Sequence, residues 1–113
     1  MYELPNAELN SQDFGIIKLE DSGKILFYNT YESELANISP KTAEGKNFFF
    51  EIAPCTNNRL FLGSFQKGIE IGENKMLFFY TFTYRMKPTN VKVMIFRKSG
   101  AKENWVFIKK NFT

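Results

Sequence analysis

The chain has no histidine and only one cysteine, Cys55, among its 113 residues. Without histidine, Ser-His-Asp hydrolases, Cys-His nucleophilic enzymes and nearly all zinc sites lose an essential member. The sequence also lacks a GxxxxGK[ST] phosphate loop and a GxGxxG dinucleotide motif, so no motif supports nucleotide chemistry. These absences predict that the protein is not an enzyme.

Other absences bear on compartment and partners. A lone cysteine cannot form an intrachain disulfide, and no apolar run follows a basic start, so we expect a cytoplasmic protein. No stretch approaches the roughly 20 apolar residues of a membrane helix, and we expect no membrane association. The net charge is only +3 and the lysines are spread along the chain, which predicts no nucleic-acid partner.

Phenylalanine, in contrast, is abundant. Thirteen phenylalanines in a chain of this length indicate a dense interior, or a pocket that holds a flat ring. The length is that of one domain with a sizeable core. We expect a single domain over residues 14–113, preceded by a short N-terminal cap at residues 1–13.

The N-terminal half predicts a hairpin followed by short helices. "FGIIKLEDSGKILFYN", residues 14–29, reads as two strands, and Gly23 can adopt the positive φ that their turn needs. Thr30 is a candidate N-cap for the first helical piece. Ser39 and Pro40 fit the N-cap and first position of a second piece, which Gly45 ends.

The C-terminal half predicts a helix and a three-stranded meander. Phe61, Phe65 and Ile69 recur every four residues, which indicates an amphipathic helix ended by Gly72. Residues 76–86 alternate as a long strand, and turns lead into strands within residues 90–98 and 104–110. One face of the long strand carries Phe78, Tyr80, Phe82, Tyr84 and Met86.

This order of elements is typical of an α+β fold, a five-stranded antiparallel sheet with helices on one face. The last two strands carry apolar residues on both faces; for example, Val93 and Ile95 alternate with Met94 and Phe96. Each face therefore needs a cover. The helices can supply one, and we expect the short N-terminal cap or a partner chain, as in a homodimer, to supply the other.

Four stretches of sequence together resemble the photoactive yellow protein family, a blue-light-sensing branch of the PAS domains. They are "GKILFYN" followed by Glu32, "GKNFFFEIAPCTNN", "YTFTYRMKPTNVKV" and "WVFIKK". The resemblance runs from about Phe14 to Lys110 and implies a PAS fold and a photoreceptor. It implies that Cys55 attaches para-hydroxycinnamic acid as a 4-hydroxycinnamoyl thioester, and that Tyr28 and Glu32 form hydrogen bonds with its phenolate.

The resemblance further implies a light cycle of trans–cis isomerisation, proton transfer from Glu32 to the phenolate, and a conformational change read by an unknown signalling protein. The residues themselves agree with these roles. Glu32 lies four residues after Tyr28, so both side chains can point into one space. A carboxyl group sealed among phenylalanines has its pKa raised by up to ~3–5 units, and in its neutral form it can donate to an anionic oxygen.

Two positions depart from the family pattern. Ala36 stands where family members of the best-known type have a threonine that supports the tyrosine, and Ile38 stands where they have an arginine that covers the phenolate. We expect these changes to alter the absorption maximum, the ground-state phenol pKa and the recovery rate, but not binding. The candidate pocket residues are Ala36, Ile38, Phe48, Pro54, Thr56, Phe82, Tyr84 and Met86.

Taken without the resemblance, these residues allow other interpretations. Cys55 can be a buried thiol that fills a core gap, and Met86 is equally typical gap filler. Glu32 can be a solvated helix glutamate. The alternative function is a pigment-free PAS module that binds another small aromatic ligand or works through protein contacts.

Overall fold

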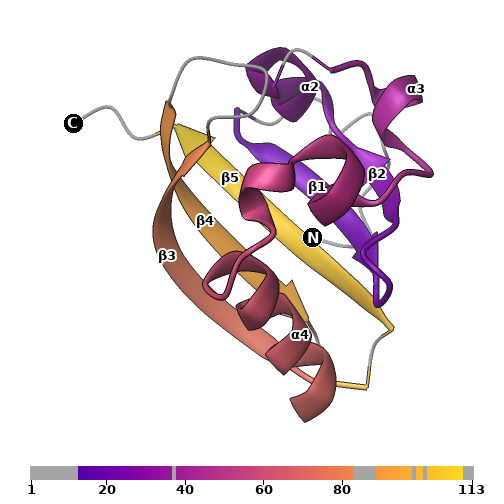
Figure 1. Cartoon of the computed structure of the whole chain (residues 1–113), viewed down its shortest axis with the longest axis vertical. Coiled ribbons are helices and arrows are strands. Elements are labelled where there is room, and N and C mark those ends of the chain that lie inside the picture. Colours follow the sequence, from indigo (N-terminus) through magenta and orange to yellow (C-terminus); the bar gives the residue numbers. More distant parts are fainter. Residues whose placement is uncertain (1–12, 37, 83–88, 98, 101, 111–113) are drawn as a thin grey trace.

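The computed structural model describes residues 13–36, 38–82, 89–97, 99–100 and 102–110. Figure 1 shows its helices and strands. In chain order they are β1 (Gly15–Glu20), β2 (Ile25–Tyr28), α2 (Thr30–Ala36), α3 (Pro40–Ala43), the π-helical turn η1 (Phe48–Ile52), the 3-10 turn η2 (Pro54–Thr56), α4 (Phe61–Ile71), β3 (Asn74–Phe82), β4 (Thr89–Arg97) and β5 (Glu103–Lys110).

The five strands form one antiparallel sheet in the order β2-β1-β5-β4-β3. The predicted hairpin is confirmed, with Gly23 in its turn at a φ of 92°. The predicted meander of β3, β4 and β5 is confirmed too. Because β1 pairs with β5, the hairpin extends the meander at its β5 edge. Tyr28, the last residue of β2, therefore lies in the same sheet as the meander.

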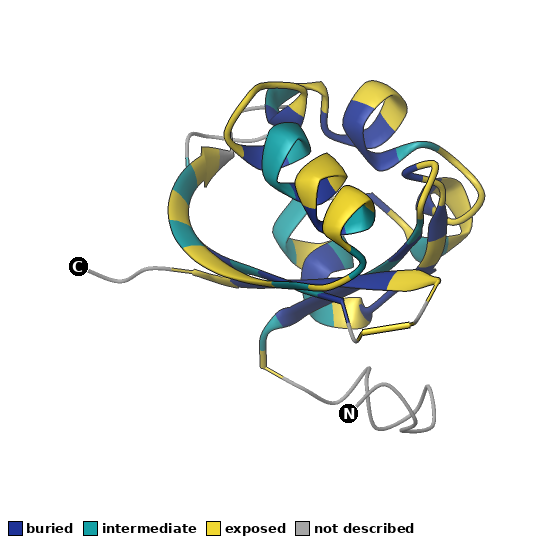
Figure 2. Ribbon diagram, turned by 90° about the horizontal axis from the view of Figure 1, so that it is seen from below, coloured by how far each residue is buried: buried dark blue, intermediate teal, exposed yellow. Residues whose placement is uncertain are grey.

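The helices and turns lie on one face of the sheet, as predicted (Figure 2). The main core fills the space between the two layers. Ile17, Val93 and Ile108 contribute to it from the sheet, and Phe49 and Phe61 from the helical layer. Successive side chains of a strand point to opposite faces of the sheet, so every second residue of a strand faces the helices and can join this core.

The boundaries of the helices largely follow the capping signals. Ser39 Oγ accepts a hydrogen bond from the Thr42 N–H, and Pro40 begins α3, as predicted. α4 ends at Gly72 with a φ of 97°, also as predicted. The expectation for Thr30 is wrong in detail: Thr30 is the first residue of α2, and the capping side chain is Asn29, whose Oδ1 accepts from the Glu32 N–H at 3.1 Å.

β3 begins at Asn74, earlier than the predicted start at Met76. Phe78 and Tyr80 pack against the core as expected, whereas Leu77 and Phe79 are exposed on the opposite face. Tyr84 and Met86 lie outside the described residues, and so does the Phe82 side chain.

The face of the sheet opposite the helices is also apolar, as predicted. Trp105 stacks on Phe107 with ring planes 5° apart, and Phe14 meets Phe107 edge-on at 6.1 Å between centroids. Residues 1–12 lie outside the described residues. The N-terminal cap, the domain boundary after residue 13 and the homodimer therefore stay predictions. In the described part of the chain, no helix combines the length and the apolar character needed to cross a bilayer.

Candidate functional site

Tyr28 and Glu32 form a buried polar pair inside an otherwise apolar layer. Tyr28 ends β2 and Glu32 lies in the first turn of α2. Their relative exposures are 1% and 3%, and their side chains hydrogen-bond each other. The structure thus brings together the two residues that the sequence predicts for one end of the site.

Asn29 fixes the geometry of this pair. Its Oδ1 accepts from the main-chain N–H of Ile16 at 2.9 Å as well as from that of Glu32, and its Nδ2 donates to the Phe14 carbonyl at 3.0 Å. β1 is held in this way against the start of α2. A Cβ at Gly15 would collide with Glu32 Oε1, so the glycine makes room for the carboxyl group.

Burial controls the protonation of the pair. Loss of hydration raises the pKa of Glu32 to about 8, although the hydrogen bond from Tyr28 acts in the opposite direction. Burial raises the pKa of Tyr28 as well, and the nearby Glu32 charge adds to that shift. At neutral pH both side chains therefore hold their protons. Among the described residues, Glu32 Oε1 has no hydrogen-bond partner.

Cys55 lies in η2, between η1 and α4, and is a free thiol of intermediate exposure that packs against the core. The turn is held locally, because the Thr56 hydroxyl donates to the Ala53 carbonyl at 2.6 Å. The Cys55 carbonyl accepts from the Asn58 amide at 3.2 Å and from the Tyr80 hydroxyl. The thiol is therefore carried on a well-supported main chain.

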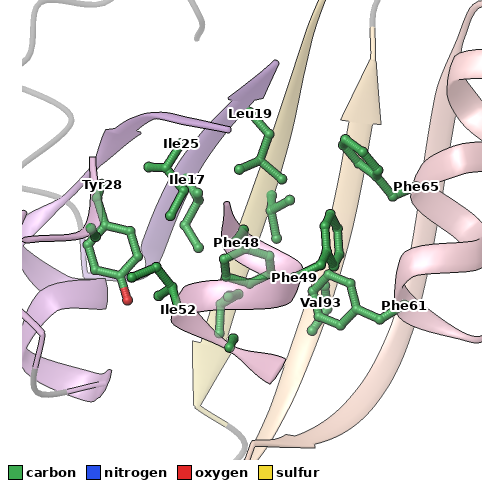
Figure 3. Close-up of a cluster of buried hydrophobic side chains, with 14 of the residues drawn as sticks. Ile17, Leu19, Ile25, Tyr28, Phe48, Phe49, Ile52, Phe61, Phe65 and Val93 are labelled. Carbon is green, nitrogen blue, oxygen red and sulfur yellow. The ribbon is translucent and has the colours of Figure 1, made fainter. Parts of the chain in front are cut away.

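Aromatic rings fill the layer between these groups and α4. Asn47 Oδ1 accepts from the Phe49 N–H at 2.9 Å and the Phe50 N–H at 3.1 Å, which starts η1 and turns Phe48 and Phe49 inward. Phe49 meets Phe65 at 4.9 Å between centroids. Figure 3 shows Tyr28 and Ile52 at one end of this core and Phe61 and Phe65 of α4 at the other.

The remaining pocket candidates differ in their placement. Ile38, Phe48 and Thr56 are buried, and Ala36 is half-buried against the core. Pro54 is exposed, which does not fit the expectation that its side chain lines a buried pocket. The side chains of Phe82, Tyr84 and Met86 lie outside the described residues.

Sequence reasoning missed three residues that organise the site, namely Asn29, Asn58 and Tyr80. An asparagine directly before a helix is a signal that could have identified Asn29. The contact of Tyr80 with Cys55 joins residues 25 apart in sequence, and no local pattern encodes it.

No protein-family model matches the chain. Individual proteins do match. The photoactive yellow protein of Rhodothalassium salexigens is 41% identical over 110 residues, which is 97% of this chain and 88% of that protein. The photoactive yellow protein domain of the sensor histidine kinase Ppr from Rhodospirillum centenum superposes with a TM-score of 0.88 at 34% identity, covering 95% of this chain and 94% of that domain.

A more distant structure supports the fold alone. The PAS domain of nitrogen regulation protein NR(II) from Vibrio parahaemolyticus gives a TM-score of 0.75 at 18% identity, covering 96% of this chain and 99% of that domain. Fold and site together define a PAS-fold sensory domain. The sequence identity to the relatives above shows the family within this class: the chain belongs to the photoactive yellow protein family of photoreceptors.

Proposed function

We propose that the protein is a blue-light photoreceptor that carries para-hydroxycinnamic acid as a thioester on Cys55. The observation that carries this proposal is the buried Tyr28–Glu32 pair, which retains both of its protons at neutral pH. A PAS domain that only packs a core has no need for a carboxyl group in its interior, because an unsatisfied buried polar group costs free energy.

The donor set suits a buried phenolate. A ring oxygen that carries negative charge needs short hydrogen bonds to replace its lost hydration. The Tyr28 hydroxyl and the protonated Glu32 carboxyl would supply two, and the Phe48 ring and the Ile52 side chain lie in the same apolar layer. The unpartnered Glu32 Oε1 shows that this carboxyl group has bonding capacity beyond Tyr28.

Cys55 would supply the attachment. Its thiolate displaces the leaving group of an activated acyl donor, so that one S–C bond forms and the bond from the acyl carbon to the leaving group breaks. This step needs no histidine, because the acyl donor is already activated. The thiol serves afterwards as an anchor.

When bound, the pigment supplies blue-light absorption and a double bond that isomerises from trans to cis. The response of the protein then depends on Glu32. As the ring oxygen loses the hydrogen bonds from its two donors, its proton affinity would rise, and the Glu32 carboxyl would transfer its proton to that oxygen. The carboxylate that remains is buried and unpaired, which costs several kcal/mol. In a domain of marginal stability this is enough to drive a signalling conformational change.

Two residues would set the properties of this pigment. Ala36 offers no side-chain donor or acceptor to support Tyr28, and the buried Ile38 excludes water without adding charge. We expect an absorption maximum, phenol pKa and recovery rate that differ from those of relatives with threonine and arginine there. One relative of this chain is a domain of a sensor histidine kinase, and a signalling protein, still unknown, would read the change here.

Reconstitution with activated para-hydroxycinnamic acid tests the function. We expect a yellow product that bleaches in blue light and an added hydroxycinnamoyl mass on the Cys55 peptide. Cys55→Ser should form no adduct, because serine is far less nucleophilic at neutral pH. A colourless wild-type protein would instead favour the pigment-free PAS module that binds another ligand or a protein.

A further inference from the structure

Two side chains hold the main chain of Cys55. The Tyr80 hydroxyl donates to the Cys55 carbonyl, and Asn58 Nδ2 donates both to that carbonyl, at 3.2 Å, and to the Tyr80 oxygen. These three groups close a small ring of hydrogen bonds, which we call the Cys55 clamp. It connects the turn η2 to β3, although Cys55 and Tyr80 are 25 residues apart.

Both side chains of the clamp are themselves held in place. Asn58 Oδ1 accepts from the Phe61 N–H at 2.9 Å, at the first residue of α4, so the amide nitrogen faces Cys55. The Tyr80 ring packs edge-on against Phe61 with centroids 5.2 Å apart, and Tyr80 pairs with Val91 of β4. The clamp therefore ties Cys55 to α4 and to the sheet at once.

We propose that Tyr80 and Asn58 are positioning residues for the thioester on Cys55, an inference that rests on the proposed function. Rotation about a double bond must displace at least one end of the molecule, and the end that is held less firmly moves. With the Cys55 main chain fixed by the clamp, the displacement falls on the oxygen end beside Tyr28 and Glu32. A site held by such supporting hydrogen bonds keeps its geometry far better than a free loop does.

Loosening the clamp should lengthen the life of the light-activated form. If the Cys55 main chain can shift after illumination, the strain created by isomerisation relaxes there, and the return to the dark state slows. The loss of one hydrogen bond of ordinary strength corresponds to a change of about three- to tenfold in rate.

Tyr80→Phe is the main test, because it removes the hydroxyl and keeps the ring against Phe61. Asn58→Asp is the second variant, since it retains the acceptor for the Phe61 N–H and loses the amide donor. Thr81→Val is the matched control. It also removes a hydroxyl from β3, but one that hydrogen-bonds Asn90 at 2.6 Å on the exposed surface.

The first measurement uses pigment-free protein, so it does not depend on the proposed function. Hydrogen exchange of the Thr56 and Asn57 amides, which donate to Ala53 and Pro54, should speed up about three- to tenfold in Tyr80→Phe and Asn58→Asp. Thr81→Val should exchange like wild type there. Unchanged exchange in Tyr80→Phe, or an equal increase over the whole sheet, would overturn the clamp.

The second measurement follows dark recovery of the reconstituted protein after a flash. Both clamp variants should form the Cys55 adduct and recover about three- to tenfold more slowly than wild type and Thr81→Val. Faster local exchange with an unchanged recovery rate would overturn the positioning role. If wild type itself forms no adduct, the proposed function fails, and the exchange data still decide whether the clamp holds this turn.

Discussion

At the scale of single residues, the central feature is a carboxylic acid kept neutral by its surroundings. Glu32 is buried at the start of α2, where Asn29 binds its N–H and Gly15 leaves space for its carboxyl group. An isolated helix N-terminus favours the ionised form of an acidic side chain. Here desolvation outweighs that preference and raises the pKa of Glu32 to about 8.

This raised pKa predicts how the stability of the pigment-free protein varies with pH. Between about pH 4.5 and about pH 8, Glu32 is ionised in the unfolded chain and protonated in the folded one. The folded state binds the extra proton, so the free energy of unfolding falls by a few kcal/mol as pH rises through this window. Glu32→Gln should remove that slope, because glutamine does not titrate.

Urea unfolding at the two ends of the window measures the effect. The exposed Glu34 of the same helix offers the matched control, and Glu34→Gln should retain the wild-type slope. If wild type and Glu32→Gln lose stability with pH to the same extent, Glu32 is not the buried acid described here, and the proton donor of the proposed light cycle is lost with it.

At the scale of elements, the turn of the β1–β2 hairpin is linked to the β4–β5 end of the sheet by a partly buried ion pair. Arg97 forms a salt bridge with Asp21, and Asn104 bridges them, accepting from Arg97 and donating to Asp21, each at 3.1 Å. The hydrogen bond from Arg97 is the main cause of the lowered pKa of Asp21. This network joins the turn after β1 to the end of β4 and the start of β5, more than 70 residues later in the sequence.

We expect Asp21→Asn to destabilise the protein by about 1–3 kcal/mol. The Arg97 side chain is only 7% exposed, and a buried guanidinium without its carboxylate is costly. The figure is below that of a fully buried pair because the Asp21 side chain is 43% exposed. The lowered pKa of Asp21 adds stability that is present above the ordinary carboxyl pKa and is lost as pH falls through the folded value.

Thermal unfolding at neutral and at acid pH compares this variant with Asp13→Asn. Asp13 also forms a salt bridge, in this case with Lys109 at 3.0 Å, but the Asp13 side chain is 85% exposed. Loss of this salt bridge should therefore leave the melting temperature unchanged. Equal melting temperatures for the two variants would contradict a structural role for the Asp21 network. We further expect the difference between wild type and Asp21→Asn to shrink in acid.

Some helices and strands could be predicted from the sequence and others could not, because only some of them have a long apolar period. α4 and the strands β3 to β5 have apolar periods long enough to determine helix or strand and which face is buried. The turn η1 has no such period, since Phe48, Phe49 and Phe50 are consecutive. Its start depends on Asn47, which also donates to the Ser22 carbonyl, 25 residues away, so the cause of this element lies in the tertiary structure.

The candidate site also has a part that the sequence predicts and a part that depends on the tertiary structure. Tyr28 and Glu32 are close in sequence, and the spacing from strand end to helix start was enough to bring them together in a prediction. The prediction that they share one site with Cys55 rests on the family resemblance alone. The support of Cys55 by Tyr80 depends on the position of β3 relative to η2, which only the folded chain defines.

At the scale of the whole molecule, the two faces of the sheet differ in what covers them. On the helical side, the Phe61 ring contacts the rings of Phe48, Phe49, Phe78 and Tyr80, with centroids 5.2–5.9 Å apart. On the other side, Phe79 is 64% exposed. The predicted homodimer would use this second face, and light scattering that shows a strict monomer at high concentration would remove it.

This asymmetry predicts opposite outcomes for two otherwise identical truncations. Phe61→Ala should cost about 3–5 kcal/mol, because it opens a cavity where helix α4 meets the sheet and the surrounding rings cannot fully close it. Phe79→Ala should change the free energy of unfolding by no more than about 0.5 kcal/mol, since the side chain is already in water in the single chain. Urea unfolding at low protein concentration gives both values. A large loss for Phe79→Ala that grows with protein concentration would mean that a second chain covers this face. Comparable small losses for both variants would mean that the aromatic layer around α4 is not the core that holds the helical layer, and with it Cys55, on the sheet.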